Sequence, residues 1–264
     1  MILAVIPARF QSSRFPGKPL ADIGGRSMIL RVCGQVQQAQ RIGQICVATD
    51  DLRIFRHVRA GGFEAVMTRP DHASGTERAA EAAAAVPEAE WILNVQGDEP
   101  FIDPAHLDLL CSTLQQPGTE IASLMEPIRR PEDLHSPHVV KVLSNAEGNA
   151  LYFSRSPIPY VREAAPEAWL SRAAFFRHVG VYGFRRDVLL RIPALSPAPA
   201  EQAESLEQLR WLHHGLRIRM ASLPAGSESP AVDTPEDWKR LTGQSLPQFW
   251  GLGGPEPGPF RAVD

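Results

Sequence analysis

The chain has 264 residues, enough to bury a sizeable core as one domain or as a domain with an insertion. Its hydrophobic content of 44% and charged content of 22% are typical of a soluble globular protein, and its net charge of −3 argues against a general nucleic-acid-binding protein while leaving room for a local basic site. The three cysteines are odd in number and far apart, so they indicate neither a disulfide framework nor a zinc site.

The first apolar stretch, MILAVIP, ends at Pro7 and is followed closely by Arg9. It is shorter than the apolar core of a signal peptide and too short to span a membrane. We therefore expect a cytoplasmic protein that does not contact a membrane.

Short apolar runs alternate with helical patterns over the first part of the chain. Buried strands are predicted at residues 2–6, 45–49 and 91–95, and helices at 27–41, 51–60 and 74–86. The last of these helices begins with Ser74 or Thr76 as a cap and continues as an Ala-rich body. This order predicts an α/β fold with a largely parallel sheet.

The pattern changes after about residue 125. Strands joined by long connections are predicted at residues 139–143, 150–155 and 177–184, and we interpret them as an antiparallel portion or insertion. A Pro/Ala-rich loop at 193–204 leads into a helix, SLEQLRWLHHG. The Pro/Gly-rich tail, 247–264, is expected to be an irregular extension.

The loop after the first predicted strand carries three cations, Arg9, Arg14 and Lys18, among prolines and Gly17. Ligands of open α/β sheets bind beyond the carboxyl ends of the strands, and Arg and Lys side chains bind phosphate oxygens there. A triphosphate site would explain the three cations, and a solvated cationic loop is the alternative. The two usual glycine fingerprints for nucleotides are missing, which disfavours a P-loop ATPase and a nicotinamide enzyme.

Two further segments carry carboxylates at the ends of predicted elements. Asp98 and Glu99 follow a buried strand through Gly97, where carboxylates can hold Mg²⁺ together with substrate phosphates. Asp233 precedes a predicted helix that starts at Thr234. The alternatives are a turn in which Asp98 only bonds backbone N–H groups, and a helix cap for Asp233.

Several blocks, in chain order, resemble the family of 3-deoxy-manno-octulosonate cytidylyltransferases, the CMP-Kdo synthetases. They are VIPARFQSSRFPGKPL, MTRPDHASGTER, NVQGDEP, ALYFSRSPIPY, RHVGVYGFR, LEQLRWL and VDTPEDWKR. The resemblance implies a Rossmann-like nucleotide-diphospho-sugar transferase fold with a mostly parallel mixed sheet. It also implies one catalytic domain over residues 1–242, with sugar binding and dimerisation in 126–190 and an irregular extension over 243–264.

The resemblance also implies a reaction, in which CTP and Kdo give CMP-Kdo, for lipopolysaccharide synthesis, and pyrophosphate. Lys18, Asp98 and Asp233 would be catalytic, and the two aspartates would hold Mg²⁺, the expected cofactor. The residues implied for CTP are Arg9, Arg14, Lys18, Ser74 and Arg78, and those implied for the sugar are Gln96, Arg155, His178, Tyr182, Glu207 and Gln208. A homodimer is the expected assembly, with no nucleic-acid partner.

Each of these roles has a plainer alternative. His178 and Tyr182 would share one face of a strand and form a core pair, Arg155 would form a surface ion pair, and Glu207 with Gln208 would lie on a solvated helix face. Two other functions also stay open. One is a cytidylyltransferase for another sugar acid, such as 8-amino-Kdo or a sialic acid, and the other is a non-catalytic nucleotide-binding protein.

Overall fold

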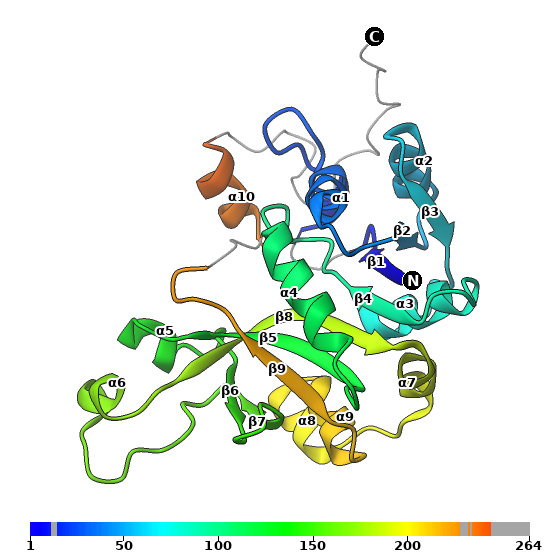
Figure 1. Ribbon diagram of the computed structural model, residues 1–264. Coiled ribbons are helices and arrows are strands. Elements are labelled where there is room, and N and C mark those ends of the chain that lie inside the picture. Colours follow the sequence, from blue (N-terminus) through cyan, green and yellow to red (C-terminus); the bar gives the residue numbers. More distant parts are fainter. Residues whose placement is uncertain (12–14, 228–231, 233, 244–264) are drawn as a thin grey trace.

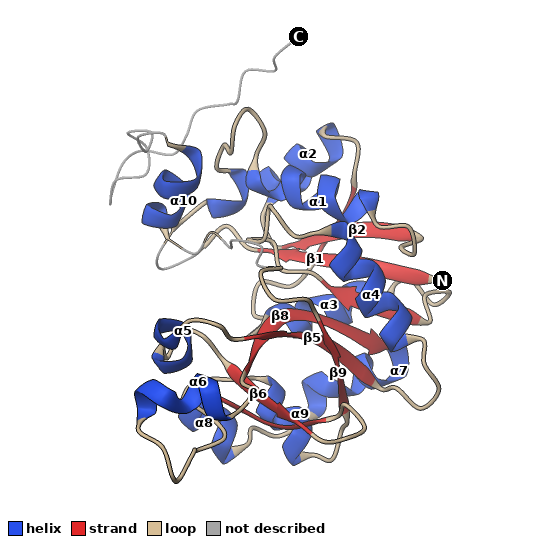
Figure 2. Ribbon diagram, turned by 60° about the vertical axis from the view of Figure 1, so that its left-hand side comes forward, coloured by secondary structure: helices blue, strands red, loops and turns tan. Residues whose placement is uncertain are grey.

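The computed structural model describes residues 1–11, 15–227, 232 and 234–243. Two residues that the sequence assigns to the site, Arg14 and Asp233, and the predicted extension beyond residue 243, lie outside these ranges. The described chain is built around one mixed sheet with helices on both faces (Figure 1, Figure 2).

The N-terminal part supplies the parallel half of the sheet. Its strands are β1 (Ile2–Ala8), β2 (Gln44–Thr49), β3 (Glu64–Met67) and β4 (Trp91–Asn94), and its helices are α1 (Met28–Gln38), α2 (Leu52–Ala60) and α3 (Gly75–Ala84), with a short 3-10 helix η1 (Lys18–Leu20). All four strands pair in parallel in the order β3-β2-β1-β4. Their carboxyl ends therefore meet at one edge of the sheet.

The second half changes direction at the long strand β8 (Phe176–Arg185), which pairs antiparallel with both β4 and β5. The remaining strands are β5 (Ile121–Pro127), β6 (Lys141–Ser144), β7 (Ala150–Ser154) and β9 (Ile218–Ser222). Strand β9 runs parallel to β5, and the β6–β7 hairpin leaves the main path at β8. The predicted antiparallel portion is therefore present, within a sheet that also contains the parallel half.

The helices of the second half cover both faces of the sheet. They are α4 (Pro104–Leu114), α5 (Pro131–His135), α6 (Trp169–Arg172), α7 (Arg186–Arg191), α8 (Pro199–Glu204), α9 (Gln208–His213) and α10 (Pro235–Thr242), with 3-10 helices η2 (Pro166–Ala168) and η3 (Ile192–Ala194). One core packs α1, α2 and α4 on one face, and a second packs α3, α7 and α9 on the other (Figure 2).

The sequence-based fold class is confirmed, with two differences in detail. Residues 199–204 of the predicted Pro/Ala loop form α8, because Pro199 occupies the first turn and the Glu201 carboxylate accepts the Ala198 N–H. Strands β3, β5 and β9 were not predicted. Within the described part of the chain, no helix is long and apolar enough to cross a membrane.

Candidate active site

The carboxyl ends of β1 and β4 and the N-terminus of α3 converge on one place. A methyl group added at Gly75 would lie 3.4 Å from Pro7 of β1 and 4.0 Å from the side-chain oxygen of Gln96. One added at Gly97 would lie 2.8 Å from the Pro7 carbonyl oxygen, so only glycine lets this turn rest against β1. Close backbone approach thus brings Gln96 to the start of the helix that Ser74 caps, and holds the turn through Gly97 against β1.

Lys18 and Asp98 meet at this edge although they are 80 positions apart. The Lys18 Nζ donates to Asp98 Oδ2 at 2.7 Å, and both side chains are partly exposed. Gly17, in the left-handed region with φ 69°, donates its N–H to the Phe10 carbonyl and so turns the loop back toward β1. Arg9 lies exposed beyond the end of β1. The structure thus joins the cationic loop to the carboxylate turn that the sequence treated separately.

Helix α10 packs against the loop that carries Lys18. Trp238 is buried in a small core with Phe15, Ile23 and Met28, and its Nε1 donates to the Asp22 carbonyl at 2.6 Å. The Val232 N–H donates to the Asp98 carbonyl at 2.9 Å. The C-terminal segment therefore contacts both the cationic loop and the Asp98 turn.

Thr234 caps α10, which bears on the alternative considered for Asp233. Its hydroxyl accepts the Asp237 N–H at 3.1 Å, and the Asp237 carboxylate accepts the Thr234 N–H at 3.0 Å. This reciprocal pair satisfies the helix start without the preceding residue. The convergence of Asp233 with Asp98 stays a prediction.

The donor set at Asp98 fits a magnesium ion that is shared with a nucleotide. Mg²⁺ is usually held by one or two carboxylates, while phosphate oxygens and water complete its shell. Asp98 offers a partly exposed carboxylate beside a lysine that can neutralise phosphate. Among the residues that the structure describes, no group of three or more His, Cys, Asp or Glu side chains forms a closed metal cage.

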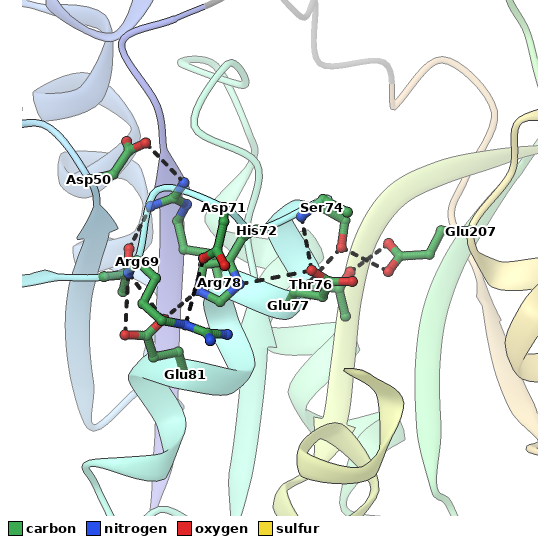
Figure 3. Close-up of polar contacts among 12 residues, drawn as sticks. Asp50, Arg69, Asp71, His72, Ser74, Thr76, Glu77, Arg78, Glu81 and Glu207 are labelled. Carbon is green, nitrogen blue, oxygen red and sulfur yellow. Dashed lines mark hydrogen bonds and ion pairs between the residues drawn. The ribbon is translucent and has the colours of Figure 1, made fainter. Parts of the chain in front are cut away.

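Ser74 caps α3 and at the same time contacts Glu207 from the other half of the molecule. Its hydroxyl accepts the Glu77 N–H at 3.2 Å and donates to Glu207 Oε1 at 2.9 Å (Figure 3). The Thr76 hydroxyl donates to Glu207 Oε2 at 2.8 Å. A residue expected at the nucleotide and one expected at the sugar are thus in direct contact, 133 positions apart.

Burial raises the pKa of the Glu207 carboxyl, while the hydrogen bonds from Thr76 and Ser74 lower it. Beside it, a cavity of about 400 Å³ lies between the start of α3 and helices α8 and α9. Arg210 forms a bidentate pair with Glu201 in its wall. Gln208 is buried at 6% exposure, so a solvated face is wrong for this residue.

Arg78 lies beneath the surface rather than on it. It is 4% exposed, its Nη1 donates to the Thr68 hydroxyl, and its Nη2 lies 3.4 Å from Asp50 Oδ2 (Figure 3). This arrangement ties α3 to the segments that follow β2 and β3. The observed contacts show that Arg78 holds the segments at Asp50 and Thr68 against α3. Its contact with CTP stays a prediction.

The loop before α3 is held against the helix by a second set of charges. His72 Nε2 bonds Glu81, and the Arg69 guanidinium lies 3.6 Å from the same carboxylate. Hydrogen bonds from His72 and the Arg69 N–H lower the pKa of Glu81 against the opposing effect of burial. These contacts with Glu81 hold the loop that leads to Ser74 against helix α3.

His178 and Tyr182 lie on one face of β8, as predicted, with ring centroids 5.2 Å apart. His178 Nε2 lies 2.9 Å from the Ser123 hydroxyl, and Ser123 also lies 2.9 Å from the Val181 carbonyl. Since a carbonyl only accepts, the Ser123 proton goes to it and His178 Nε2–H donates to Ser123. Burial lowers the pKa of His178 to about 3, which keeps the imidazole neutral with Nδ1 as an acceptor.

Tyr182 sits deeper, packed edge-on against Trp211 with ring centroids 4.9 Å apart. Its hydroxyl is buried and has no hydrogen-bond partner among the described residues. Burial raises the pKa of Tyr182 well above its usual value, and the nearby Glu207 carboxylate adds to the rise. A buried hydroxyl of this kind gains strongly from a polar partner.

The Arg155 guanidinium binds backbone carbonyls. Its Nε donates to Glu204 O at 2.7 Å, Nη1 to Pro137 O at 2.9 Å and Nη2 to Ser205 O at 3.4 Å. Ser205 has φ 51°, in the left-handed region, and directly precedes the segment that carries Glu207. The surface ion pair considered from the sequence is therefore wrong for Arg155, which secures the turn at 204–205, and its contact with a sugar carboxylate stays a prediction.

A buried lysine supports the same turn. Lys141 Nζ donates to the carbonyls of Ser136, Val139 and Arg155, and burial lowers its pKa to about 8. The Ser154 hydroxyl and the Arg155 N–H both bind the Glu204 carboxylate. Strand β7 and the turn before α9 are thus joined by an extensive polar network.

Thr76, Asn94 and Ser123 are the site residues that sequence reasoning did not select. Thr76 links α3 to Glu207, Asn94 contacts Thr76 from β4, and Ser123 orients His178. Thr76 belongs to the SGTER block and Asn94 to the NVQGDEP block, and those motifs could have pointed to them. Ser123 belongs to no such motif, and its role depends on how β5 and β8 pair in the sheet.

The fold and the site together define a nucleotidyltransferase. A family model described as Cytidylyltransferase matches residues 3–218. A 3-deoxy-manno-octulosonate cytidylyltransferase of Porphyromonas gingivalis is 48% identical over 243 residues, covering 90% of this chain and 94% of the relative. One from Myxococcus xanthus is 48% identical over 239 residues, with the same coverage of both chains.

Solved structures agree. A CMP:2-keto-3-deoxy-manno-octonic acid synthetase complexed with CTP is 43% identical, covers 92% of this chain and 97% of its own, and has a TM-score of 0.85. A 4-diphosphocytidyl-2C-methyl-D-erythritol synthase from Anaerococcus prevotii, 12% identical with a TM-score of 0.61, shares the fold alone. The chain belongs to the cytidylyltransferase family and, within it, to the 3-deoxy-manno-octulosonate cytidylyltransferases.

Proposed function

We propose that this chain transfers CMP from CTP to the anomeric hydroxyl of Kdo, releasing pyrophosphate and forming CMP-Kdo. The contact between Ser74 and Glu207 carries this proposal, because it places the expected nucleotide and sugar residues at one helix terminus. The Lys18–Asp98 pair at the neighbouring strand ends adds the charge that phosphate transfer requires. The similarity to relatives of that name over nine-tenths of the chain supports the substrate pair.

The reaction is a displacement at the α-phosphorus. The anomeric oxygen forms the new bond, the bond to the β-phosphate oxygen breaks, and the hydroxyl proton leaves to solvent. Arg9 and Lys18 neutralise the phosphates, and the N–H groups at the start of α3 favour negative charge nearby. When bound by Asp98 and Asp233, Mg²⁺ would neutralise further phosphate charge and lower the pKa of the attacking hydroxyl. Positioning supplies the rest of the catalysis, and no covalent enzyme intermediate is required.

The sugar side orients the attacking hydroxyl. Neutral His178 offers an acceptor at Nδ1, and the buried Tyr182 hydroxyl offers a donor. Glu207 accepts sugar hydroxyls in this proposal, and Gln96 and Gln208 bind the sugar as well. Arg155 is the residue proposed to meet the sugar carboxylate, in addition to its support of the turn at 204–205.

Pyrophosphate release from CTP, Kdo and Mg²⁺ tests the proposal. ATP, GTP and UTP replace CTP as controls, and EDTA followed by Mg²⁺ tests the cofactor. Formation of CMP-Kdo, identified by mass spectrometry, is the expected result. Absence of turnover with tight CTP binding would instead favour a non-catalytic nucleotide-binding protein.

A different sugar acid is the second candidate for the acceptor. The cavity beside Glu207 is also lined by Glu77, Glu201 and Arg210. Because Arg210 pairs with Glu201, Glu77 and Glu207 are the carboxylates that would favour an ammonium group on the sugar. Parallel kcat/KM measurements with Kdo, 8-amino-Kdo and a sialic acid decide between them. We expect Kdo to be preferred.

We also propose a homodimer formed through residues 126–190. Leu151, Tyr152 and Tyr160 are large apolar side chains exposed in this portion, Tyr160 at 73%. Light scattering after gel filtration should give twice the chain mass, and Tyr160→Glu should shift the equilibrium toward monomer.

We also propose a cytoplasmic location and a role in lipopolysaccharide synthesis, since CTP is a cytoplasmic nucleotide and CMP-Kdo is an activated sugar donor.

A further inference from the structure

Thr76 lies where α3, β4 and the segment before α9 meet. Its side chain is 3% exposed, and its hydroxyl accepts from Asn94 Nδ2 at 3.4 Å. A hydroxyl has one proton, and this one is donated to Glu207 Oε2 at 2.8 Å (Figure 3). Asn94 ends β4, so this long contact links the Thr76 hydroxyl to the sheet.

We propose that Thr76 is a positioning residue for the transfer reaction, holding the Glu207 carboxylate in the orientation that receives the sugar hydroxyls. This inference rests on the function proposed above. Ser74 binds one carboxylate oxygen and Thr76 binds the other, so the carboxylate plane is fixed by two donors from one helix turn. The remaining lone pairs on both oxygens are then the acceptors for the substrate.

Thr76 differs from Ser74 in what its hydroxyl does. The Ser74 hydroxyl also caps α3, so its loss would disturb the helix and the proposed CTP site together. Among the described residues, the hydrogen bonds of the Thr76 hydroxyl are those with Asn94 and Glu207. Removing it leaves the cap of α3 in place and takes away one donor to Glu207 and one acceptor for Asn94.

The charges around Glu207 come from four elements. Glu77 of α3 raises the pKa of the Glu207 carboxyl, Arg210 of α9 lowers it, and the Tyr182 hydroxyl of β8 lies nearby. Glu201 of α8 faces the site through its pair with Arg210. Burial raises the pKa of Glu207, and the hydrogen bonds from the Thr76 and Ser74 hydroxyls lower it. Loss of the Thr76 hydroxyl should make Glu207 bind its proton at a higher pH.

Thr76→Val tests the proposal, because valine keeps the shape and removes the hydroxyl. We expect kcat/KM for Kdo to fall by about ten- to a hundredfold, as for the loss of a hydrogen bond to a charged group. KM for CTP should stay within about twofold, since no nucleotide contact is removed. The acid limb of the kcat/KM profile for Kdo should move to higher pH. Thr76→Ser, which retains the hydroxyl, should restore both values.

Thr113→Val is the matched control. Thr113 is also a buried helical threonine, in α4, and its hydroxyl donates to the Leu109 carbonyl away from the site. This control variant should leave kcat/KM for Kdo and its pH profile unchanged. If Thr76→Val does not fold, Thr76→Ala replaces it. Equal losses for CTP and Kdo, an unmoved acid limb, or failure of Thr76→Ser to rescue would overturn the proposal. Lack of CMP-Kdo formation by the unaltered protein would instead refute the proposed function.

Discussion

The two sides of the site are prepared for their ligands in different ways. On the parallel side, Arg9, Lys18 and Asp98 stand on loops beyond strand ends, partly open to water. On the antiparallel side, His178 and Tyr182 are packed on a strand, and Arg155 is bonded to three backbone carbonyls. The first side leaves its charged groups partly exposed, with Lys18 and Asp98 paired to each other, whereas the second side holds its polar groups in fixed contacts.

The difference follows from what each ligand brings. A triphosphate carries several negative charges, so Arg9 would exchange water for phosphate oxygens, whereas Lys18 would exchange or share its contact with Asp98. A sugar acid is recognised mainly through neutral hydroxyls, for which fixed donors and acceptors lower the ordering cost of binding. We therefore expect substitutions on the parallel side to act on charge and chemistry, and those on the antiparallel side to act on geometry and stability as well.

Asp98→Asn should give the largest effect. The amide keeps the shape of the carboxylate but removes its charge, which should lower kcat by about a hundred- to a thousandfold, as for loss of a preorganised electrostatic group. The melting temperature should change little, because the side chain is partly exposed. Pyrophosphate release across a Mg²⁺ titration is the measurement.

Asp233→Asn and the double variant sharpen this test. If both carboxylates bind one ion, the double variant costs little more than the worse single, because the pair acts as a unit. Fully additive losses would contradict a shared Mg²⁺. So would a crystal structure with CTP and Mg²⁺ in which the two carboxylates lie more than about 8 Å apart.

Lys18→Ala should follow, with kcat/KM for CTP reduced about ten- to a hundredfold by loss of a charge-assisted phosphate contact. KM for Kdo should be nearly unchanged. The control is Lys239→Ala, which removes a different lysine, on α10. It should change neither kcat/KM for CTP nor KM for Kdo. Unaltered CTP affinity in the Lys18 variant would show that this loop does not bind phosphate.

The antiparallel side predicts a mixed result for Arg155→Ala. KM for Kdo should rise about tenfold while CTP binding is retained, and unfolding free energy should fall by about 1–3 kcal/mol because three carbonyl partners lose their donor. Kinetics with both substrates and urea denaturation measure the two effects. A stability loss without any change in KM for Kdo would make Arg155 a structural residue only.

Apolar continuity explains which parts of the fold were predictable. The runs at β1 and β4 and the second half of β2 are buried and apolar, so their strands could be predicted. Strand β9 (IRMAS) mixes polar and apolar residues, and the four residues of β3 are exposed or half-buried. The prolines around α8 indicated a loop, although proline also suits a first helical turn.

Charged motifs explain which parts of the site were predictable. Lys18 and Asp98 were selected separately for their positions after strands, but their contact depends on the order of the strands in the sheet. Thr76 and Ser123 are ordinary hydroxyl residues whose roles arise from partners 131 and 55 positions away. Such long-range hydrogen bonds leave no periodic signal in the sequence.

The smallest expected effect concerns the pH dependence of stability at His178. Burial lowers its pKa from 6.5 to about 3, so the unfolded chain binds this proton below pH 6.5 while the folded chain does not. Stability is therefore retained above pH 6.5 and lost progressively as the pH falls toward 3. Between pH 6.5 and 5 the loss should be about 1.6 kcal/mol.

His178→Gln removes this titration while keeping a side chain that can donate to Ser123. The variant should be less stable than the unaltered protein at pH 8, where only the packing against Phe153 and Tyr182 is lost. The gap should narrow on acidification, because only the unaltered protein then has to keep a buried imidazole neutral. Urea midpoints at pH 8, 6.5 and 5 follow this gap. A constant gap across the three pH values would mean that the imidazole is open enough to be protonated in place, and the antiparallel side would then resemble the partly exposed parallel side.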